Sequence, residues 1–181
     1  MKRCIGAICV VVVGAFLLSC TNPDGPPTEL PWTERVVPGD MSPSAWTGIA
    51  SSADGTKLAA VVRYGLIYTS TDSGANWTEC ASAGERLWRC VASSDDGSKL
   101  AAAVSQGYIY TSTDSGASWT EHASAGARNW YSIASTADGA KLAAAVAGGY
   151  IYTSADGGAS WTARASEGSW QDITISAYDG T

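Results

Sequence analysis

The chain repeats its own sequence every 42 residues, and this periodicity limits the folds that are open to it. A tryptophan opens each of three successive units, a lysine follows eleven residues later, and a second tryptophan closes the unit. In chain order these positions are Trp46, Lys57 and Trp77, then Trp88, Lys99 and Trp119, then Trp130, Lys141 and Trp161. Because a unit of this size cannot bury an apolar face alone, it must stack on copies of itself.

Each unit reads as four short β-strands joined by tight turns. In the second unit the expected strands cover residues 88–93, 99–104, 108–112 and 119–123, and the segments between them are rich in Gly, Ser and Asp. The second strand is apolar and small, the third is rich in aromatic and β-branched residues, and no window shows helical periodicity. A four-stranded unit of about 40 to 45 residues is typical of a β-propeller blade. The sequence therefore predicts an all-β propeller of four-stranded antiparallel blades.

The turn between the third and fourth expected strands carries the most specific motif, Ser-x-Asp-x-Gly-x-x-Trp. Its three copies are Ser70, Asp72, Gly74 and Trp77, then Ser112, Asp114, Gly116 and Trp119, then Ser154, Asp156, Gly158 and Trp161. In such a turn the carboxylate can accept backbone N–H groups, Gly can take a left-handed conformation, and Trp can pack beneath the hairpin. The motif resembles the Asp-box of the bacterial neuraminidase repeat (BNR) family of sialidase-like propellers, over residues 32–181. That resemblance implies that the three aspartates are structural and lie away from the active face.

The ends of the repeat array suggest an incomplete ring. Residues 32–35 match the start of a fourth strand, and residues 170–181 match a first strand that stops early. The expected units are 46–87, 88–129 and 130–169, with a partial unit at 170–181. Since propellers need at least four blades to close, we expect an open arc from a longer propeller of about six to eight blades. Closure through self-association of the open edges is the alternative.

The N-terminus reads as an export signal. Lys2 and Arg3 precede an apolar run of about fourteen residues, which is too short for a membrane span and suits a signal peptide over residues 1–20. The residues before Cys20 resemble a bacterial lipobox, which implies lipidation of Cys20 and anchoring in the cell envelope. Thr21 makes the outer membrane the expected location rather than the inner one. An ordinary signal peptide with a chance cysteine is the alternative, and residues 21–31 read as a flexible tether.

Charge and cysteine content exclude several partners. Without Lys2 and Arg3 the chain keeps nine basic and seventeen acidic residues, which argues against nucleic acid or an anionic membrane surface as the partner.

Cys80 and Cys90 fall on different strands at positions where the other units have no cysteine, so a disulfide is not favoured. No cysteine, histidine or aspartate spacing indicates a metal site, and no cofactor is expected.

A ligand is expected on the loops where the repeats differ, which join the second strand to the third and one unit to the next. The candidate ligand-facing residues are Arg63, Tyr64, Arg86, Gln106, Arg128, Asn129 and Tyr131. Arginine beside aromatic rings suits a carboxylated or sugar ligand. The alternative is that these residues only seat each loop on its neighbour.

No catalytic constellation stands out. The Arg-Ile-Pro motif, the arginine triad and the Tyr–Glu pair of sialidases have no counterparts, and His122 is the single histidine. We therefore expect a non-enzymatic, envelope-anchored BNR-type propeller that binds a glycan or a protein. A truncated or degenerate sialidase-like glycoside hydrolase is the first alternative. The second is a propeller resembling the photosystem II assembly factors, which would predict a basic patch that this acidic chain lacks.

Overall fold

The computed structural model of the chain describes residues 46–164 and 167–175. The expected signal peptide, tether and isolated strand at Trp32 lie outside these residues. Within them the chain forms 13 strands, all paired antiparallel, and two single turns of 3-10 helix. The prediction of an all-β protein is confirmed. None of the described helices is long and apolar enough to cross a membrane.

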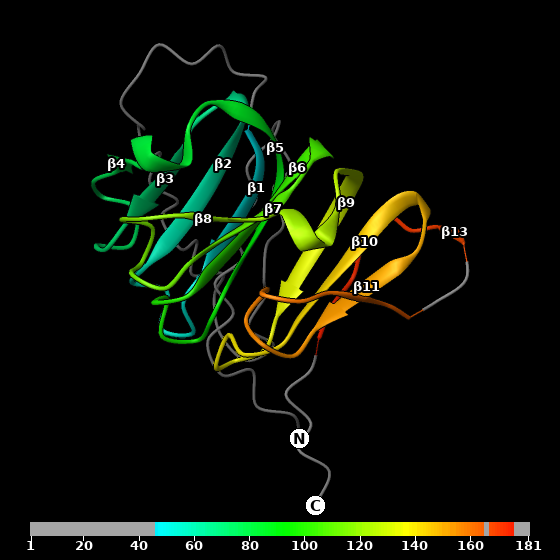
Figure 1. Cartoon of the computed structure of the whole chain (residues 1–181). Helices are drawn as coiled ribbons and strands as arrows, with labels where there is room; N and C mark the ends of the chain where they lie inside the picture. The colour runs from blue at the N-terminus through cyan, green and yellow to red at the C-terminus, as the bar shows by residue number, and fades with distance from the viewer. Residues whose placement is uncertain (1–45, 165–166, 176–181) are drawn as a thin grey trace, which may run out of the picture.

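The strands form three blades of four strands, and within each blade every strand pairs with the next (Figure 1). Blade 1 holds β1 (Trp46–Ser51), β2 (Leu58–Gly65), β3 (Ile67–Ser70) and β4 (Thr78–Glu79). Blade 2 holds β5 (Arg86–Ser93), β6 (Leu100–Gly107), β7 (Ile109–Ser112) and β8 (Thr120–His122). Blade 3 holds β9 (Arg128–Ser135), β10 (Leu142–Gly149), β11 (Ile151–Ser154) and β12 (Thr162–Ala163). The 3-10 turns η1 (Ala81–Ala83) and η2 (Ala123–Ala125) follow blades 1 and 2, and β13 (Gly168–Ser169) follows blade 3.

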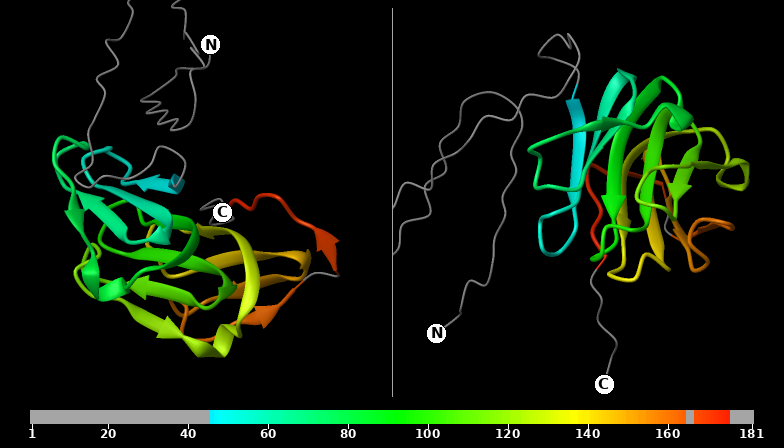
Figure 2. Two further views of the ribbon diagram at one scale, coloured as in Figure 1. Left: turned by 90° about the horizontal axis from the view of Figure 1, so that it is seen from above. Right: turned by 90° about the vertical axis from the view of Figure 1, so that its left-hand side faces the viewer.

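The second strand of each blade runs further than the sequence predicts. The expected strand 99–104 becomes β6, which ends at Gly107. The extension forms because Ser105 and Gly107 pair with Asn129 and Arg128 at the start of β9. The same link joins β2 to β5 and β10 to β13. The three blades are thereby tied into one sheet and form an open arc (Figure 2).

The expected strand that begins at Trp170 does not form. Residues 170–175 are irregular, and the only strand of this partial unit is β13, which pairs with the extension of β10. In blades 1 to 3 the first strand is held along its length by the second strand of the same blade. Among the described residues the partial unit has no second strand, so only its link to blade 3 remains.

The apolar core consists of two layers, each between neighbouring blades. In the first layer Ala59, Val61 and Ile67 of blade 1 pack against blade 2, where Trp88 is fully buried. In the second layer the alternate side chains of blade 2 meet blade 3, whose Trp130 is fully buried. Because successive residues of a strand point to opposite faces, the apolar strand β6 supplies both layers. This double burial explains why the second strand of each unit is apolar throughout.

The two ends of the blades carry different loops. We call one end the Asp-box face; it holds the turn after the first strand and the Asp-box turn of each blade, residues 52–57, 71–77, 94–99, 113–119, 136–141 and 155–161. We call the other end the loop face; it holds residues 63–66, 80–87, 105–108, 122–129, 147–150 and 167–169. The alternation of strand direction in an antiparallel sheet places these two sets of loops at opposite ends.

A lysine clamps neighbouring blades together at the Asp-box face. Lys99 Nζ of blade 2 donates a hydrogen bond of 2.8 Å to the Asp138 carbonyl of blade 3, beside a backbone bond from Asp95 N–H to the Ala137 carbonyl, also of 2.8 Å. The lysine stem crosses Gly139 so closely that a Cβ there would lie 2.8 Å from Lys99 Cβ and Cδ. Gly97 and Lys57 repeat this arrangement between blades 1 and 2. The conserved spacing of lysine and turn glycine in the repeat thus has a steric cause.

Replacing Gly139 by alanine should weaken the contact between blades 2 and 3. Gly139 has φ of 67°, and Gly148 has φ of 66° with no atom within 4 Å of its added Cβ. Both alanine variants bear the left-handed strain, whereas only Gly139→Ala also meets Lys99, so it should lose about 1–3 kcal/mol more. Chemical denaturation of the two variants measures this difference. Equal losses of stability in the two variants would show that the Lys99 side chain can move aside without a measurable change in the free energy of unfolding.

Candidate functional site

Each Asp-box turn is closed by its own aspartate. In blade 2, Asp114 Oδ1 accepts hydrogen bonds from Ser112 Oγ and from the Ser118 backbone N–H, both at 2.8 Å. Asp114 Oδ2 accepts a third bond of 2.6 Å from Ser118 Oγ. These hydrogen bonds hold the pKa of Asp114 at about 2, with the Ser118 hydroxyl contributing most. Asp72 and Asp156 are bonded in the same way in blades 1 and 3, and their pKa values are also about 2.

The other motif residues complete the turn. Ser112 Oγ accepts a bond of 2.9 Å from the backbone N–H of Gly116, which has φ of 93°. Trp119 Nε1 donates to the Gly116 carbonyl at 3.1 Å, and its ring lies 6.3 Å from that of Trp88. Every polar side-chain group of the motif is therefore engaged inside the turn in blade 2, whereas Trp77 Nε1 of blade 1 is buried without a hydrogen-bond partner among the described residues. The hydrogen bonds that the sequence predicts for these turns are present.

The loop face carries two arginines in one repeated arrangement. Arg86 Nε donates a bond of 3.0 Å to the Ala83 carbonyl of η1, and its guanidinium carbon lies 4.6 Å from the centre of the Tyr110 ring. Arg128 makes the same two contacts with Ala125 and Tyr152, again at 3.0 and 4.6 Å. Both arginines are exposed, and their guanidinium groups are held in place before any ligand binds.

A hydrogen-bonded glutamate lies behind the first of these stacks. The Tyr110 hydroxyl donates to Glu121, and burial together with this bond raises the pKa of Tyr110 to about 12. Tyr110 also packs edge-on against Trp88, with ring centres 5.2 Å apart. The Arg86 guanidinium thus stacks on a neutral tyrosine ring that is held in place by the interblade core.

The remaining candidate residues have different environments. Tyr64 is 72% exposed, with Arg63 5.3 Å from the centre of its ring, and Gln106 is exposed at the equivalent turn position. Asn129 is not free, because its Oδ1 accepts a bond of 2.8 Å from Ser105 Oγ. Tyr131 lies on an inner strand rather than on a loop.

The sequence analysis did not predict two further residues near the candidate site, Arg89 and Tyr150. Arg89 stacks on Tyr131 with 4.1 Å from guanidinium carbon to ring centre, across the inner strands of blades 2 and 3. Tyr150 is 40% exposed at the end of blade 3. Arg89 and Tyr131 share one repeat position, which holds Thr47 and Gln171 in the other units. This variation between units was the sequence signal that could have identified Arg89.

Cys80 of blade 1 and His122 of blade 2 lie beneath the Asp-box glycine of the next blade, and Arg164 holds the same repeat position in blade 3. A Cβ on Gly116 would lie 3.2 Å from Cys80 Sγ, and one on Gly158 would lie 3.4 Å from the His122 ring. His122 Nε2 and Thr111 Oγ1 are 2.7 Å apart. Burial lowers the pKa of His122, and the nearby charge of Asp156 opposes that shift only in part. The cysteines Cys80 and Cys90 are free thiols.

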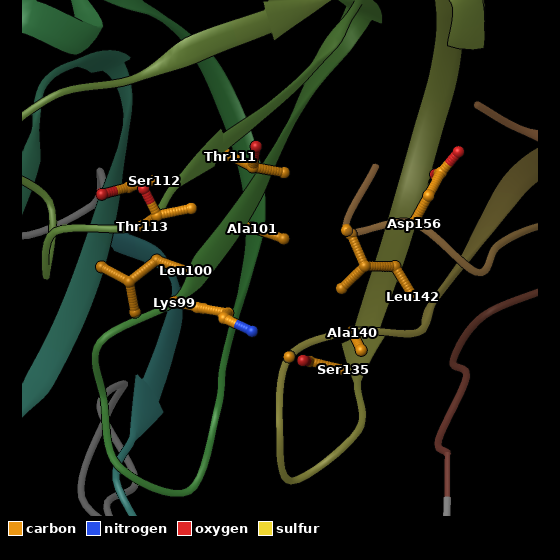
Figure 3. A pocket seen from close by; sticks show the side chains of 12 residues that line it. Lys99, Leu100, Ala101, Thr111, Ser112, Thr113, Ser135, Ala140, Leu142 and Asp156 are labelled. Carbon is orange, nitrogen blue, oxygen red and sulfur yellow. The ribbon is translucent and has the colours of Figure 1, made fainter. Parts of the chain in front are cut away.

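A cavity of about 300 Å³ opens between blades 2 and 3 at the Asp-box face (Figure 3). Lys99, Leu100 and Thr111 line it from blade 2, and Ala140 and Leu142 line it from blade 3. In residues 46–164 and 167–175, His, Cys, Asp and Glu side chains form no group of three that could hold a metal ion.

No protein-family model and no curated protein matches the chain. Among solved structures, a GH74 enzyme from Niastella koreensis is 30% identical with a TM-score of 0.56, over 69% of this chain and 18% of that one. YCF48 from Cyanidioschyzon merolae is 22% identical with a TM-score of 0.55, over 66% of this chain and 36% of that one. A structure of YCF48 bound to D1 peptide is 16% identical with a TM-score of 0.57, over 69% and 41%.

These similarities define the class of fold. The chain has the blade architecture of β-propeller proteins, and the predicted blade structure is confirmed. The chain spans less than half the length of each of these three structures.

Acid should weaken the Asp-box turns between about pH 4 and pH 2. Asp114 has a folded pKa of about 2, below its ordinary value of 3.8, so its contribution to stability is complete above 3.8 and is lost as the pH falls toward 2. Asp114→Asn should flatten this part of the stability profile. Asp95→Asn is the control, because the Asp95 carboxylate makes no side-chain hydrogen bond among the described residues. Tryptophan fluorescence across an acid titration follows the loss, and identical profiles for both variants would contradict it.

A second pH effect should come from His122. Its folded pKa lies below the ordinary 6.5, so the unfolded chain binds the proton more readily. The contribution of neutral His122 to the free energy of unfolding should be complete above pH 6.5 and should fall as the pH drops from 6.5 toward the pKa of His122 in the folded state. His122→Cys, which copies the residue of the preceding blade, should remove this slope. Denaturation midpoints at pH 7.5 and 5 measure it, and a slope that persists in the variant would rule out His122 as its source.

Proposed function

We propose that this protein is a non-enzymatic, envelope-anchored propeller module that binds a protein segment through its loop face. The observation that carries the proposal is the pair of arginine–tyrosine stacks, Arg86 on Tyr110 and Arg128 on Tyr152. Each guanidinium is fixed by the bond from its Nε, so binding would require little further ordering of the side chain. Exposed arginines held in this way suit carboxylate groups.

The distribution of charge supports an acidic partner for the loop face. The Asp-box face carries seven aspartates against three lysines, and the aspartates are Asp54, Asp72, Asp95, Asp96, Asp114, Asp138 and Asp156. The described loops of the loop face carry three arginines against two glutamates. A ligand with carboxylates is therefore repelled from one end of the blades and accepted at the other.

One similar structure supports the choice of a protein segment as the ligand. YCF48 was solved with the D1 peptide bound, although at 16% identity it shows only that this fold can hold a peptide. A glycan with acidic groups is the alternative ligand of the same face. The proposed anchor is Cys20, whose lipidation would place the module at the bacterial cell envelope, by the resemblance of the preceding residues to a lipobox.

A glycoside hydrolase is the second candidate, and the 30% identity to a GH74 enzyme favours it. The aspartates that the repeat contributes at Asp72, Asp114 and Asp156 are occupied within their turns, with pKa values near 2. A carboxylic acid that donates a proton during glycoside hydrolysis needs a raised pKa. These residues are therefore suited to support the blades rather than to act on a sugar.

Binding should depend on the two stacked arginines. The double variant Arg86→Met, Arg128→Met keeps the aliphatic stems and removes two charges, so affinity for acidic peptides should fall at least about tenfold. The control is Lys141→Met with Arg164→Met, which removes two charges elsewhere. Peptide and acidic-glycan arrays probed with the full chain, followed by titration of the best ligands, give the comparison. Equal losses in the two double variants would refute the loop-face site, and turnover of fluorogenic glycosides by the full chain would favour the enzyme.

A further inference from the structure

We propose that the cavity between blades 2 and 3 is a second binding site, which takes a branched aliphatic side chain and the adjoining backbone carbonyl of a neutral polypeptide segment. It lies at the Asp-box face, opposite the loop face. Ala101 of blade 2 and Ala140 and Leu142 of blade 3 form its apolar walls, and Lys99 extends across its edge (Figure 3). Its volume of about 300 Å³ reaches the lower end of the range of small-ligand sites.

The equivalent cleft between blades 1 and 2 is closed, which shows that the cavity is not a general property of the repeat. That cleft has a volume of about 10 Å³. The repeat residues at the twelve lining positions of the larger cavity are the same in both clefts except at two. Ser98 of the closed cleft is replaced by Ala140, and Ser115 is replaced by Gly157. Ser115 lines the closed cleft, so the change to glycine removes side-chain atoms there, whereas Ser98 Oγ is bonded to the Asp96 carboxylate.

The backbone around the two differing positions is unchanged. The Ser115 N–H donates to the Ser98 carbonyl at 2.9 Å, and the Gly157 N–H donates to the Ala140 carbonyl at 2.9 Å. The φ angles of Ser115 and Gly157 are 57° and 66°, so serine already adopts the required conformation in one blade. Relief of left-handed strain can explain the glycine, but it does not explain the alanine. The loss of the Ser115 side chain at Gly157 is in addition consistent with the larger volume of the cleft between blades 2 and 3.

The polar groups of the cavity favour a neutral acceptor. Lys99 Nζ donates to one backbone carbonyl, that of Asp138, and an ammonium group has three donors. The carboxylate of Asp156 accepts three hydrogen bonds from Ser154 and Ser160 of its own turn. Asp156 and Asp138 outnumber the single Lys99 charge locally, so a carboxylate ligand is disfavoured. A second backbone carbonyl is the acceptor that this lysine suits.

The residues that line the cavity indicate that the ligand side chain has about the size of leucine. Leu142, Ala101 and Ala140 face the space, and none of the lining residues is aromatic. Aliphatic surface of this kind gains from excluding water with a branched apolar group. The absence of an aromatic platform among these residues argues against a sugar ring as the occupant.

The first test measures ligand chemistry by NMR titration of the isotope-labelled full chain, read at the amides of Gly139 and Gly157. N-acetyl-leucine methylamide should bind saturably, and N-acetyl-alanine methylamide about tenfold more weakly, because it lacks the branched group. N-acetyl-leucine, which ends in a carboxylate, should also bind more weakly than the methylamide. A pentapeptide with a central leucine and blocked ends should match or exceed the methylamide. No saturable binding, preference for the carboxylate, or failure of the pentapeptide would each overturn the proposal.

The second test exchanges residues between the two clefts. Ala140→Ser with Gly157→Ser copies the closed cleft and should abolish binding, while Ser98→Ala with Ser115→Gly copies the open one and should create a second site. Lys99→Met should weaken binding of N-acetyl-leucine methylamide about tenfold, whereas Lys141→Met, at the same repeat position, should leave this affinity unchanged. Unchanged thermal unfolding shows that the exchanged chains are folded. Binding that survives the serine pair, or a stoichiometry that stays at one in the opened variant, would contradict the site.

Discussion

Contact between neighbouring blades is the interaction on which the rest of the structure depends. A four-stranded meander with an apolar second strand has two faces to bury, and both clusters of the described core lie in the layers between blades. The extended second strands, the lysine clamps and the turn hydrogen bonds all join one blade to the next. The stability of each blade is therefore largely a property of its neighbours, as in other repeat proteins.

The Asp-box has the opposite character, because it is self-sufficient. Its aspartate, serine and glycine satisfy one another within a single turn, so the turn can form without help from another blade. Only the tryptophan of the motif extends into the interblade core, where it meets the tryptophan of the first strand. The motif thus connects a local hairpin to the long-range packing.

The sequence predicts the fold more fully than it predicts the candidate sites. Strand order and the Asp-box bonds follow from short-range patterns, such as the spacing of Ser112, Asp114 and Gly116. The stack of Arg86 on Tyr110 joins residues on different strands, and the clamp of Lys99 on Gly139 joins different blades, so neither follows from local spacing. The strand expected at Trp170 did not form for the same reason, since it depends on a partner strand. The cavity between blades 2 and 3 lies where the repeat changes at Ala140 and Gly157, and this change becomes informative only when the two clefts are compared.

The Cys80, His122 and Arg164 position has a consequence for the order of assembly. Blades that are nearly identical can pair in the wrong sequence during folding, which is a recognised hazard of tandem repeats. This one position gives the two interblade interfaces a different chemistry, a small thiol beneath the Asp-box of blade 2 and a ring of lowered pKa beneath that of blade 3. A blade packed on the wrong neighbour would contact the wrong group there. Cys80 and His122 can therefore distinguish two otherwise interchangeable surfaces and mark the succession of blades along the chain.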